Sequence, residues 1–328
     1  MSSKKYLVTG ATGFLGNNVV RQLLDAGQHV RVLTRAGGGD SRPLAGLDVE
    51  VATGDIRDAA AVSRAVQGMD AIVHSAASVH IGWSQAREQQ QINVEGSRNI
   101  ATAAREHGAR LVHVSTVNTL GLGLRDRPGD EENFLPGAVL CPYVVTKREA
   151  EQVVLSEVAK GLSAAIVNLG FMLGPWDWKP SSGKLVLEAA KFAMVAPSGA
   201  CSVCDVRDVA AGVLSAAKSS ASGRRFVLGG YQTSYRQIFT EFARLNKRME
   251  PLFTLGPILN WIGAVGGDLK TRFTGRESAV NSASVAMSQQ DHCFSSSRAE
   301  AELGYRNRPM EETITAAWNW FLEYGYVR

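Results

Sequence analysis

Three glycines near the start of the chain constrain its fold more than any other feature. Gly10, Gly13 and Gly16 follow the apolar run Tyr6–Thr9 and precede a segment with helical periodicity. In a strand-to-helix turn with this spacing, the first glycine permits a tight turn and the second lets backbone approach a pyrophosphate. The third lets the helix pack on the strand, and the N-terminus of that helix then faces the anion. Because a glycine pattern alone is weak, its position between a strand and a helix is what predicts a dinucleotide site.

Short apolar strands alternate with helical segments through the first half of the chain. The predicted strands are Tyr6–Thr9, Val30–Thr34, Val49–Thr53, Ala71–His74, Arg110–Ser115 and Ala164–Leu169. The predicted helices are Gly16–Ala26, Ala59–Val66, Gln85–His107 and Tyr143–Lys160, with shorter helices in Ser297–Tyr326. Such alternation is typical of a parallel sheet covered on both faces. We therefore predict an α/β fold, a doubly wound parallel sheet of the Rossmann type.

The alternation fades beyond residue 170, which predicts two parts of different character. Residues 1–170 are expected to form mainly the cofactor-binding core, and residues 171–328 mainly a smaller C-terminal substrate-binding lobe with some segments returning to the core. Within this lobe the segment Pro251–Gly267 is apolar but interrupted by glycine and proline. Its length of about 17 residues is at the lower limit for spanning a bilayer. We predict a buried or lid helix there, and peripheral contact with a lipid-like substrate stays open.

Composition excludes several classes of function. The 328 residues are 45% apolar, which suffices for a large core, and the net charge is +4 with dispersed lysines and arginines. We therefore expect no nucleic-acid partner and no membrane span. The first ten residues lack the apolar region of a signal peptide, so a cytoplasmic location is expected. Cys201 and Cys204 have no second pair of ligands nearby, which predicts a structural role and no metal.

The end of the second predicted strand indicates which dinucleotide is bound. An NAD enzyme offers Asp or Glu to the ribose at this point, whereas this chain has Thr34 and Arg35. A guanidinium suits a 2′-phosphate, so NADP(H) is favoured and NAD(H) remains possible. Arg42 is a possible second cation or simply an exposed loop residue. Asp55 follows the third strand, where it either accepts from the adenine or caps the next helix.

A tyrosine and a lysine four residues apart are candidates for proton transfer. Tyr143 and Lys147 fall on one face of a predicted helix that begins after Pro142. The ammonium is expected to lower the pKa of the phenol and to hold the ribose. Ser115 and Thr116 follow the fifth strand at the carboxyl edge of the sheet, where doubly wound folds bind ligands. A hydroxyl there can orient a carbonyl beside Tyr143.

These motifs together resemble the extended short-chain dehydrogenase/reductase family, also known as the NAD-dependent epimerase/dehydratase family. Within it the chain is similar to the dihydroflavonol 4-reductase-like and 3β-hydroxysteroid dehydrogenase-like branch. The resemblance covers nearly the whole chain through TGATGFLG, GDIRD, IVHSAA, INVEGSRNI, VHVSTVNTLG, YVVTK, NLGFMLGPWD, DVRDVA and FSSSRAEAELGY.

The resemblance implies specific roles along the chain. Thr116, Tyr143 and Lys147 would be catalytic, with Ser115 as the alternative hydroxyl. Asn93 matches a family asparagine or distorts its helix through hydrogen bonds. The sequence Asn168-Leu169-Gly170 departs from the usual Asn-Pro-Gly or Arg-Pro, which alters the expected nicotinamide pocket. The residues expected to bind the cofactor are Gly10, Thr12, Gly13, Phe14, Leu15, Gly16, Arg35, Asp55, Ile56, Ala76, Ala77, Ser78, Tyr143, Lys147, Leu169 and Met172.

The predicted reaction is the reduction of a ketone or aldehyde, or oxidation of the alcohol, in a ring-containing small molecule. Trp83, Trp176 and Trp178 either sandwich the ring or anchor the core or a lid. A nucleotide-sugar epimerase or dehydratase with bound NAD is the alternative, and a non-catalytic cofactor sensor is a third possibility. The basic residues available for a sugar diphosphate are Lys179, Lys184, Lys191 and Arg207. Helices at 85–107 and 143–160 occupy the positions that many relatives use for a dimer interface, and monomers also exist in the reductase branch, so both a homodimer and a monomer stay open.

Overall fold

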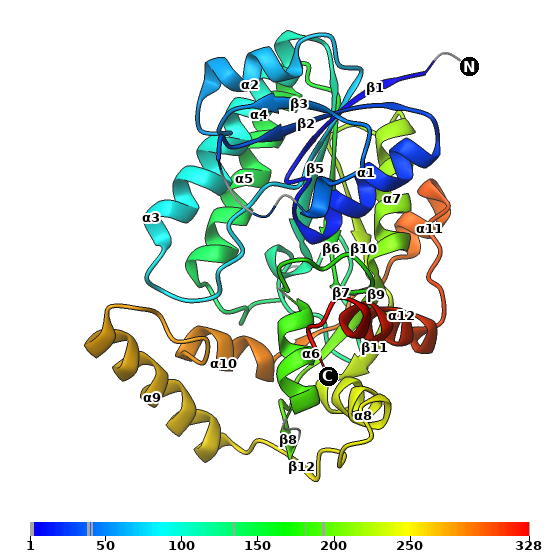
Figure 1. Cartoon of the computed structure of the whole chain (residues 1–328). Coiled ribbons are helices and arrows are strands. Elements are labelled where there is room, and N and C mark those ends of the chain that lie inside the picture. Colours follow the sequence, from blue (N-terminus) through cyan, green and yellow to red (C-terminus); the bar gives the residue numbers. More distant parts are fainter. Residues whose placement is uncertain are drawn as a thin grey trace.

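A seven-stranded parallel sheet forms the centre of the molecule. The computed structural model describes residues 3–37, 40, 42–133, 135–180, 182–191 and 194–327, without the side chains of residues 188–191 and Pro257. Its strand order is β10-β6-β5-β4-β1-β2-β3 (Figure 1). The strands are β1 Lys5–Thr9, β2 His29–Thr34, β3 Glu50–Thr53, β4 Ala71–His74, β5 Arg110–Thr116, β6 Ala164–Leu169 and β10 Arg224–Leu228. This confirms the doubly wound sheet, since every predicted strand is present within one residue of its expected ends.

Helices cover both faces of this sheet and bury an apolar layer against each. On one face lie α1 Phe14–Asp25, α7 Val206–Lys218 and α11 Ser297–Leu303, which pack with Val20, Val32 and Val213 in one core. On the other face lie α2 Ala59–Val66, α4 Gly96–Glu106 and α5 Pro142–Ala159, which pack around Ile72 and Ile100. Central strands are apolar on both sides because neither face of the sheet meets water.

The segment predicted as one helix over residues 85–107 contains a π-helical turn. It consists of α3 Ala86–Gln89, a π-helical turn Gln90–Glu95 and α4. The Asn93 amide lies in the π-helical turn and bonds both backbone groups of Ser78 and the Thr146 hydroxyl. A wider turn at this point re-aims a side chain without ending the helix. The predicted helix is therefore present and continuous, and Asn93 distorts it through its hydrogen bonds, as one of the two alternatives for this residue predicted.

Smaller sheets and the remaining helices form the lower part of Figure 1. One sheet holds β7 Phe171–Leu173, β9 Ala200–Asp205, β11 Tyr231–Ser234 and β13 Asp291–His292, and the other holds β8 Val195–Ala196 and β12 Phe253–Thr254. The helices here are α6 Ser182–Lys191, α8 Tyr235–Leu245, α9 Pro257–Thr274, α10 Ser282–Gln289 and α12 Met310–Glu323; short 3-10 turns occur at Arg42–Leu44 and Val117–Thr119. A separate apolar core joins α8 and α12 through Phe242, Trp318 and Phe321.

The apolar segment that begins near Pro251 forms α9, which lies on the outside of the molecule. Its large apolar side chains are exposed, including Trp261 at 67% and Phe273 at 84%. The alternative that this helix is buried was therefore wrong. Within the described residues, no helix is both long and apolar enough to cross a membrane.

Candidate active site

The glycine turn brings β1, β4 and the start of α1 into close contact. Gly10 has a φ of +72°, and a Cβ there would lie 2.7 Å from the backbone nitrogen of Ala76. A Cβ on Gly16 would lie 2.2 Å from the Gly10 carbonyl oxygen. Gly13 is the N-cap of α1 and has no side chain to bond its first amides, and no acidic residue lies in the first turn. These free amides and the positive helix end fit an anionic pyrophosphate.

The other predicted residues of this turn divide between core and surface. The side chains of Phe14 and Leu15 are buried in the core beneath the turn, so their backbone amides rather than their side chains face outward. Thr12 is partly exposed. Leu169 and Met172 pack in the same core as Phe14 and Leu15, and Leu169 pairs with Thr116 across adjacent strands.

Two arginines, Arg35 and Arg57, act on Asp55 near the position predicted to distinguish NADP(H) from NAD(H). Arg35 is exposed directly after β2, and its charge helps to lower the pKa of Asp55. Hydrogen bonds from Arg57 are the main cause of that lowered pKa. The Arg57 guanidinium holds both carboxylate oxygens of Asp55, at 2.9 and 2.7 Å. Arg57 was missed by sequence reasoning, although it stands two residues after a predicted site residue.

The partners of neighbouring residues bear on the alternatives predicted for Asp55 and Arg42. Asp58, not Asp55, caps α2 by accepting from the first amides of the helix. Arg42 is turned to Asp40 in a bidentate ion pair at 2.6–2.9 Å, as expected of a loop residue. Ile56 is buried against Gly96, where a Cβ would lie 2.6 Å from the Ile56 side chain.

A chain of contacts links the glycine turn to the proposed proton-transfer residues. Ala76, Ala77 and Ser78 are partly buried after β4, and Ala76 lies against Gly10. The backbone NH and carbonyl of Ser78 bond the Asn93 amide at 2.8 and 3.0 Å. Asn93 also donates to Thr146, the neighbour of Lys147, at 3.0 Å.

Thr116, Tyr143 and Lys147 lie together at the carboxyl end of β5. Pro142 occupies the first turn of α5, where its missing amide costs nothing, and Tyr143 follows it. The Tyr143 phenol interacts with the Thr116 side chain, whose hydroxyl oxygen accepts from the Asn118 amide at 3.3 Å. The Lys147 amine is buried and donates to the Val114 carbonyl at 2.6 Å. The three predicted residues are thus brought together.

Ser115 is occupied by a different partner. Its hydroxyl donates to Glu151, which also accepts from Thr119 at 2.7 Å, Asn168 at 2.8 Å and Arg225 at 2.8 Å. Glu151 is buried and was missed by sequence reasoning. Its signal was present, because it lies one helical turn beyond Lys147 on the same face of α5.

The pKa values of the pair differ from the expectation. Burial raises the pKa of Tyr143 to about 12, and the hydrogen bond with Thr116 opposes this. Burial lowers the pKa of Lys147 to about 8, and the nearby Glu151 carboxylate opposes this. The phenol pKa is therefore raised and not lowered in the protein alone, because desolvation of the ring outweighs the interaction with Thr116.

Apolar side chains from distant segments pack around Tyr143. Ile81 comes from the loop after β4, Val139 from the loop before α5, and Ala283 and Met287 from α10. These residues form the surroundings that a substrate must share with the phenol. Met287 was missed by sequence reasoning, and no local pattern identifies it.

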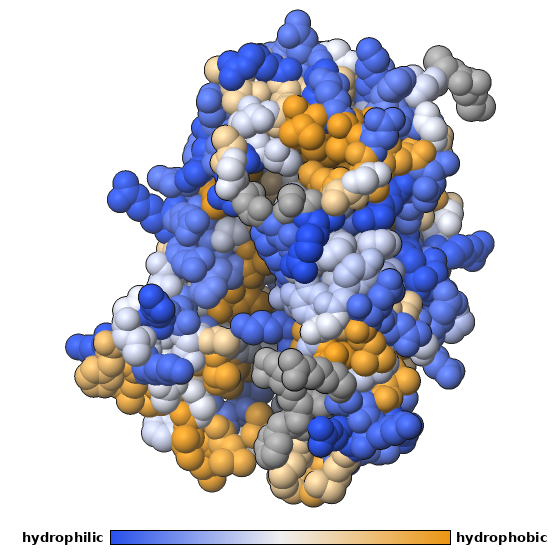
Figure 2. Space-filling model, in the orientation of Figure 1, coloured by the Kyte–Doolittle hydropathy of each residue, from blue (hydrophilic) through white to orange (hydrophobic). Residues whose placement is uncertain are grey.

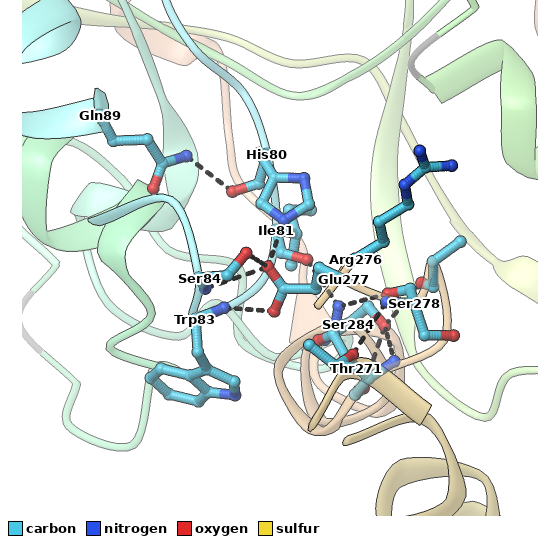
Figure 3. Close-up of polar contacts among 12 residues, drawn as sticks. His80, Ile81, Trp83, Ser84, Gln89, Thr271, Arg276, Glu277, Ser278 and Ser284 are labelled. Carbon is cyan, nitrogen blue, oxygen red and sulfur yellow. Dashed lines mark hydrogen bonds and ion pairs between the residues drawn. The ribbon is translucent and has the colours of Figure 1, made fainter. Parts of the chain in front are cut away.

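Glu277 ties α9 and α10 to the loop after β4, as Figure 3 shows. Its carboxylate accepts from His80 at 2.6 Å, from the Ser84 hydroxyl and amide, and from the Trp83 amide. A Cβ on Gly82 would lie 2.3 Å from this carboxylate. Burial alone would raise the pKa of Glu277, but the hydrogen bonds from Ser84, Trp83 and His80 hold it at about 2. The helices α9 and α10 form a hairpin that covers Tyr143. The buried Glu277 carboxylate therefore joins this hairpin to the loop after β4.

The three tryptophans predicted either to contact a substrate ring or to anchor the fold lie in different surroundings. Trp178 packs against Trp320 and Tyr324 of the C-terminal region, with ring centroids 5.3 and 4.8 Å apart. Trp176 lies 6.1 Å from Trp178 and carries the Arg21 guanidinium over its ring at 3.4 Å. These two are anchors, as one of the two alternatives predicted. Trp83 is half exposed and donates to Ser282 at 2.9 Å.

Where the structure describes them, the basic residues proposed for a sugar diphosphate are exposed or paired. Arg207 is paired with Asp205 at the start of α7, at 2.6 Å. Lys179 and Lys184 are exposed, and the side chain of Lys191 lies outside the described residues.

The CxxC cysteines are buried in different cores. Cys201 lies in the core of the second lobe and Cys204 in the core of the main sheet. Burial raises the pKa of both thiols. Within the described ranges no group of three or more His, Cys, Asp or Glu residues is placed to hold a metal ion.

Comparison with known proteins decides the family. The profile of the NAD dependent epimerase/dehydratase family matches residues 6–229. The chain belongs to this family. The resemblance seen in its motifs is thereby confirmed, and with it the class of activity: an NAD(P)-dependent enzyme acting on CH–OH or carbonyl groups.

Relatives align over almost the full chain. Sterol demethylase protein B of Methylococcus capsulatus is 32% identical over 98% of this chain and 99% of its own. A Synechocystis protein provisionally named dihydroflavonol 4-reductase is 33% identical over 98% of this chain and 96% of its own. The crystal structure of gox2253 superimposes with a TM-score of 0.84 at 32% identity, covering 99% of this chain and 100% of that one.

Proposed function

We propose that this enzyme is an NADP(H)-dependent oxidoreductase that reduces a ketone or aldehyde of a ring-containing small molecule, or oxidises the corresponding alcohol. One observation carries the proposal: the Tyr143 side chain packs against an apolar cluster while its phenol interacts with the Thr116 side chain. A polar pair within apolar surroundings suits a carbonyl on an otherwise apolar molecule.

The proposed residues act on the proton and the substrate oxygen. The bound dinucleotide supplies or accepts the hydride. Tyr143 gives its phenol proton to the carbonyl oxygen during reduction, and it takes the proton back during oxidation. A pKa of about 12 keeps the phenol protonated near neutral pH, which favours its use as an acid. Thr116 shares the hydrogen bond that orients the oxygen, and Lys147 places a positive charge beneath the phenol.

The cofactor preference is proposed from the end of β2. Arg35 is exposed there, while Arg57 is held by both carboxylate oxygens of Asp55 and so neutralises the neighbouring anion. A guanidinium suits the 2′-phosphate of NADP(H).

We expect Arg35→Ala to weaken NADPH binding by at least about 10-fold, the loss of one charge-assisted contact, and to change NADH binding little. Arg42→Ala is the matched control, because Arg42 is paired with Asp40. Dissociation constants measured for both nucleotides test this, and equal losses for NADPH and NADH would contradict it.

The names of two relatives support the substrate class. Both a sterol and a dihydroflavonol are ring-containing molecules. The apolar residues around Tyr143 agree with such a substrate better than with a sugar diphosphate, which requires cations.

The test is NADPH oxidation by the purified enzyme with aldehydes, aryl ketones, ketosteroids and nucleotide sugars. With the best substrate, Tyr143→Phe should lose about 10²–10⁴-fold in turnover. Tyr231→Phe, which alters an exposed tyrosine, should keep full turnover. Full turnover by Tyr143→Phe would refute the mechanism. Conversion of nucleotide sugars with retained NAD would refute the substrate class.

A further inference from the structure

The outward face of α9 is apolar along its whole length. Its exposed side chains recur at spacings of three and four residues, so they lie on one side of the helix. They are Ile258, Leu259, Trp261, Ile262, Val265, Leu269 and Phe273. Figure 2 shows hydrophobic surface gathered over this helix at the lower left of the molecule. An ordinary surface helix turns this face to the core.

Contacts on the opposite side of α9 hold it in this orientation. A Cβ on Gly267 would lie 1.7 Å from the Val280 carbonyl oxygen, so the helix backbone is close to the following segment. The buried Asn260 amide donates to Leu255. Thr271 accepts from the Ser278 amide at 3.0 Å. Small and polar residues therefore form the inner face, and the helix cannot rotate its apolar face inward without breaking these contacts.

The charges of α9 are divided between its two sides. Asp268 is the one acidic residue of the helix, and its carboxylate accepts from the Ser282 amide at 3.0 Å on the inner side. Lys270 and Arg272 are exposed, as is Arg276 just beyond the helix. The outer side thus combines apolar residues with cations and offers no carboxylate.

From this combination we propose that α9 binds the surface of an anionic lipid bilayer, lying in the plane of the interface. Apolar and aromatic residues on one face flanked by Lys and Arg are the features of helices that bind in this way, and cations add attraction to anionic headgroups. A second copy of the chain fits less well. Stable interfaces use about 20–30 residues per partner, and a second α9 offers no outward carboxylate to pair with the cations of the first.

Co-sedimentation with vesicles tests the proposal on the full chain. The vesicles are phosphatidylcholine alone, or equal parts phosphatidylcholine and phosphatidylglycerol. We expect binding to the mixed vesicles and much weaker binding to phosphatidylcholine alone. Trp261→Ser with Phe273→Ser should weaken binding at least about 10-fold by removing buried apolar area. Lys270→Glu with Arg272→Glu should weaken it by more than about 25-fold, because loss of the two cations alone costs about 5-fold each and the new carboxylates add repulsion.

Matched substitutions elsewhere separate the helix from general effects. Val51→Ser with Leu322→Ser removes exposed apolar residues from β3 and α12, and Arg64→Glu with Lys218→Glu reverses exposed charges on α2 and α7. Both controls should bind mixed vesicles like the unchanged protein. Absence of binding, or equal loss in the controls, would overturn the proposal. So would a dimer in solution that the Trp261 and Phe273 substitutions convert to a monomer, because the face would then be an interface between copies.

Discussion

At the scale of single residues, Ser115 and Thr116 are neighbours whose hydroxyls have separate partners. Ser115 donates to the buried Glu151 carboxylate, whereas Thr116 is bonded to Tyr143. Because successive side chains of a strand point in opposite directions, only one of two adjacent hydroxyls at its end can face a given partner. The structure therefore favours Thr116 over Ser115 for the proposed role.

Substitution of the two hydroxyls should separate activity from stability. We expect Thr116→Val to reduce turnover by about 10²-fold or more, since it removes a hydrogen bond at the reacting oxygen, with little effect on unfolding. Ser115→Ala should keep most turnover but lower the free energy of unfolding by about 1–3 kcal/mol, because a buried carboxylate loses a donor. Steady-state kinetics and urea unfolding of both variants measure these effects. The reverse pattern would assign the role to Ser115.

At the scale of elements, the α9–α10 hairpin is attached to the loop after β4 mainly through Glu277. This loop and the hairpin are joined by further bonds from Asn281 to the Ile81 carbonyl at 3.0 Å and from Trp83 to Ser282 at 2.9 Å. Since Tyr143 packs against the cluster that contains Ala283 and Met287 of α10, we expect opening of this attachment to expose the phenol. A substrate that reaches Tyr143 from this side must pass the hairpin.

Glu277→Gln should loosen the hairpin without unfolding the molecule. The amide keeps the shape but loses the charge-assisted bonds to His80 and Ser84, so local opening should increase on the order of 10-fold. Hydrogen exchange of the α9 and α10 amides measures this opening. Glu250→Gln, at an exposed glutamate paired with Arg244, is the control. Unchanged exchange in Glu277→Gln would show that other contacts hold the hairpin.

At the scale of the whole molecule, two histidines lie inside the central sheet. His74 bonds Thr9 at 2.7 Å and Ser97 at 3.1 Å, and burial lowers its pKa to about 3. His113 lies beside it, with ring centroids 5.4 Å apart and no hydrogen-bond partner among the described residues. Burial, and then the charge of Lys147, lower the pKa of His113 well below its usual value. Both side chains are therefore neutral in the folded protein.

These histidines should make the fold sensitive to acid. Below about pH 6.5 the unfolded chain binds protons that the folded chain excludes, so stability falls with falling pH by about 1.4 kcal/mol per histidine and pH unit. His113→Leu should remove the share that His113 contributes, while His74 and His292, whose pKa burial also lowers, keep theirs. Urea unfolding from neutral pH to about pH 5 measures the slope. His29→Leu is the control, because His29 is exposed, and an unchanged slope in His113→Leu would contradict the prediction.

Short-range features of this protein followed from its sequence alone. The glycine turn, the strand ends and the one-turn spacing of Tyr143 and Lys147 depend on residues close together in the chain, where backbone geometry and side-chain periodicity are sufficient. The family motifs extended this to Thr116. The parallel sheet followed as well, because alternating strands and helices leave few other arrangements.

Tertiary structure decided what depends on residues far apart in the chain. It supplied the partners of the Asn93 amide in the π-helical turn, which are Ser78 and Thr146. It raised the pKa of Tyr143 through burial beneath α10, and it brought Glu277 to His80, 197 positions away. It also turned the apolar face of α9 outward, since the inner face is filled by contacts with the following segment. Desolvation and long-range contacts exist only once the chain has folded, so no local pattern reports them.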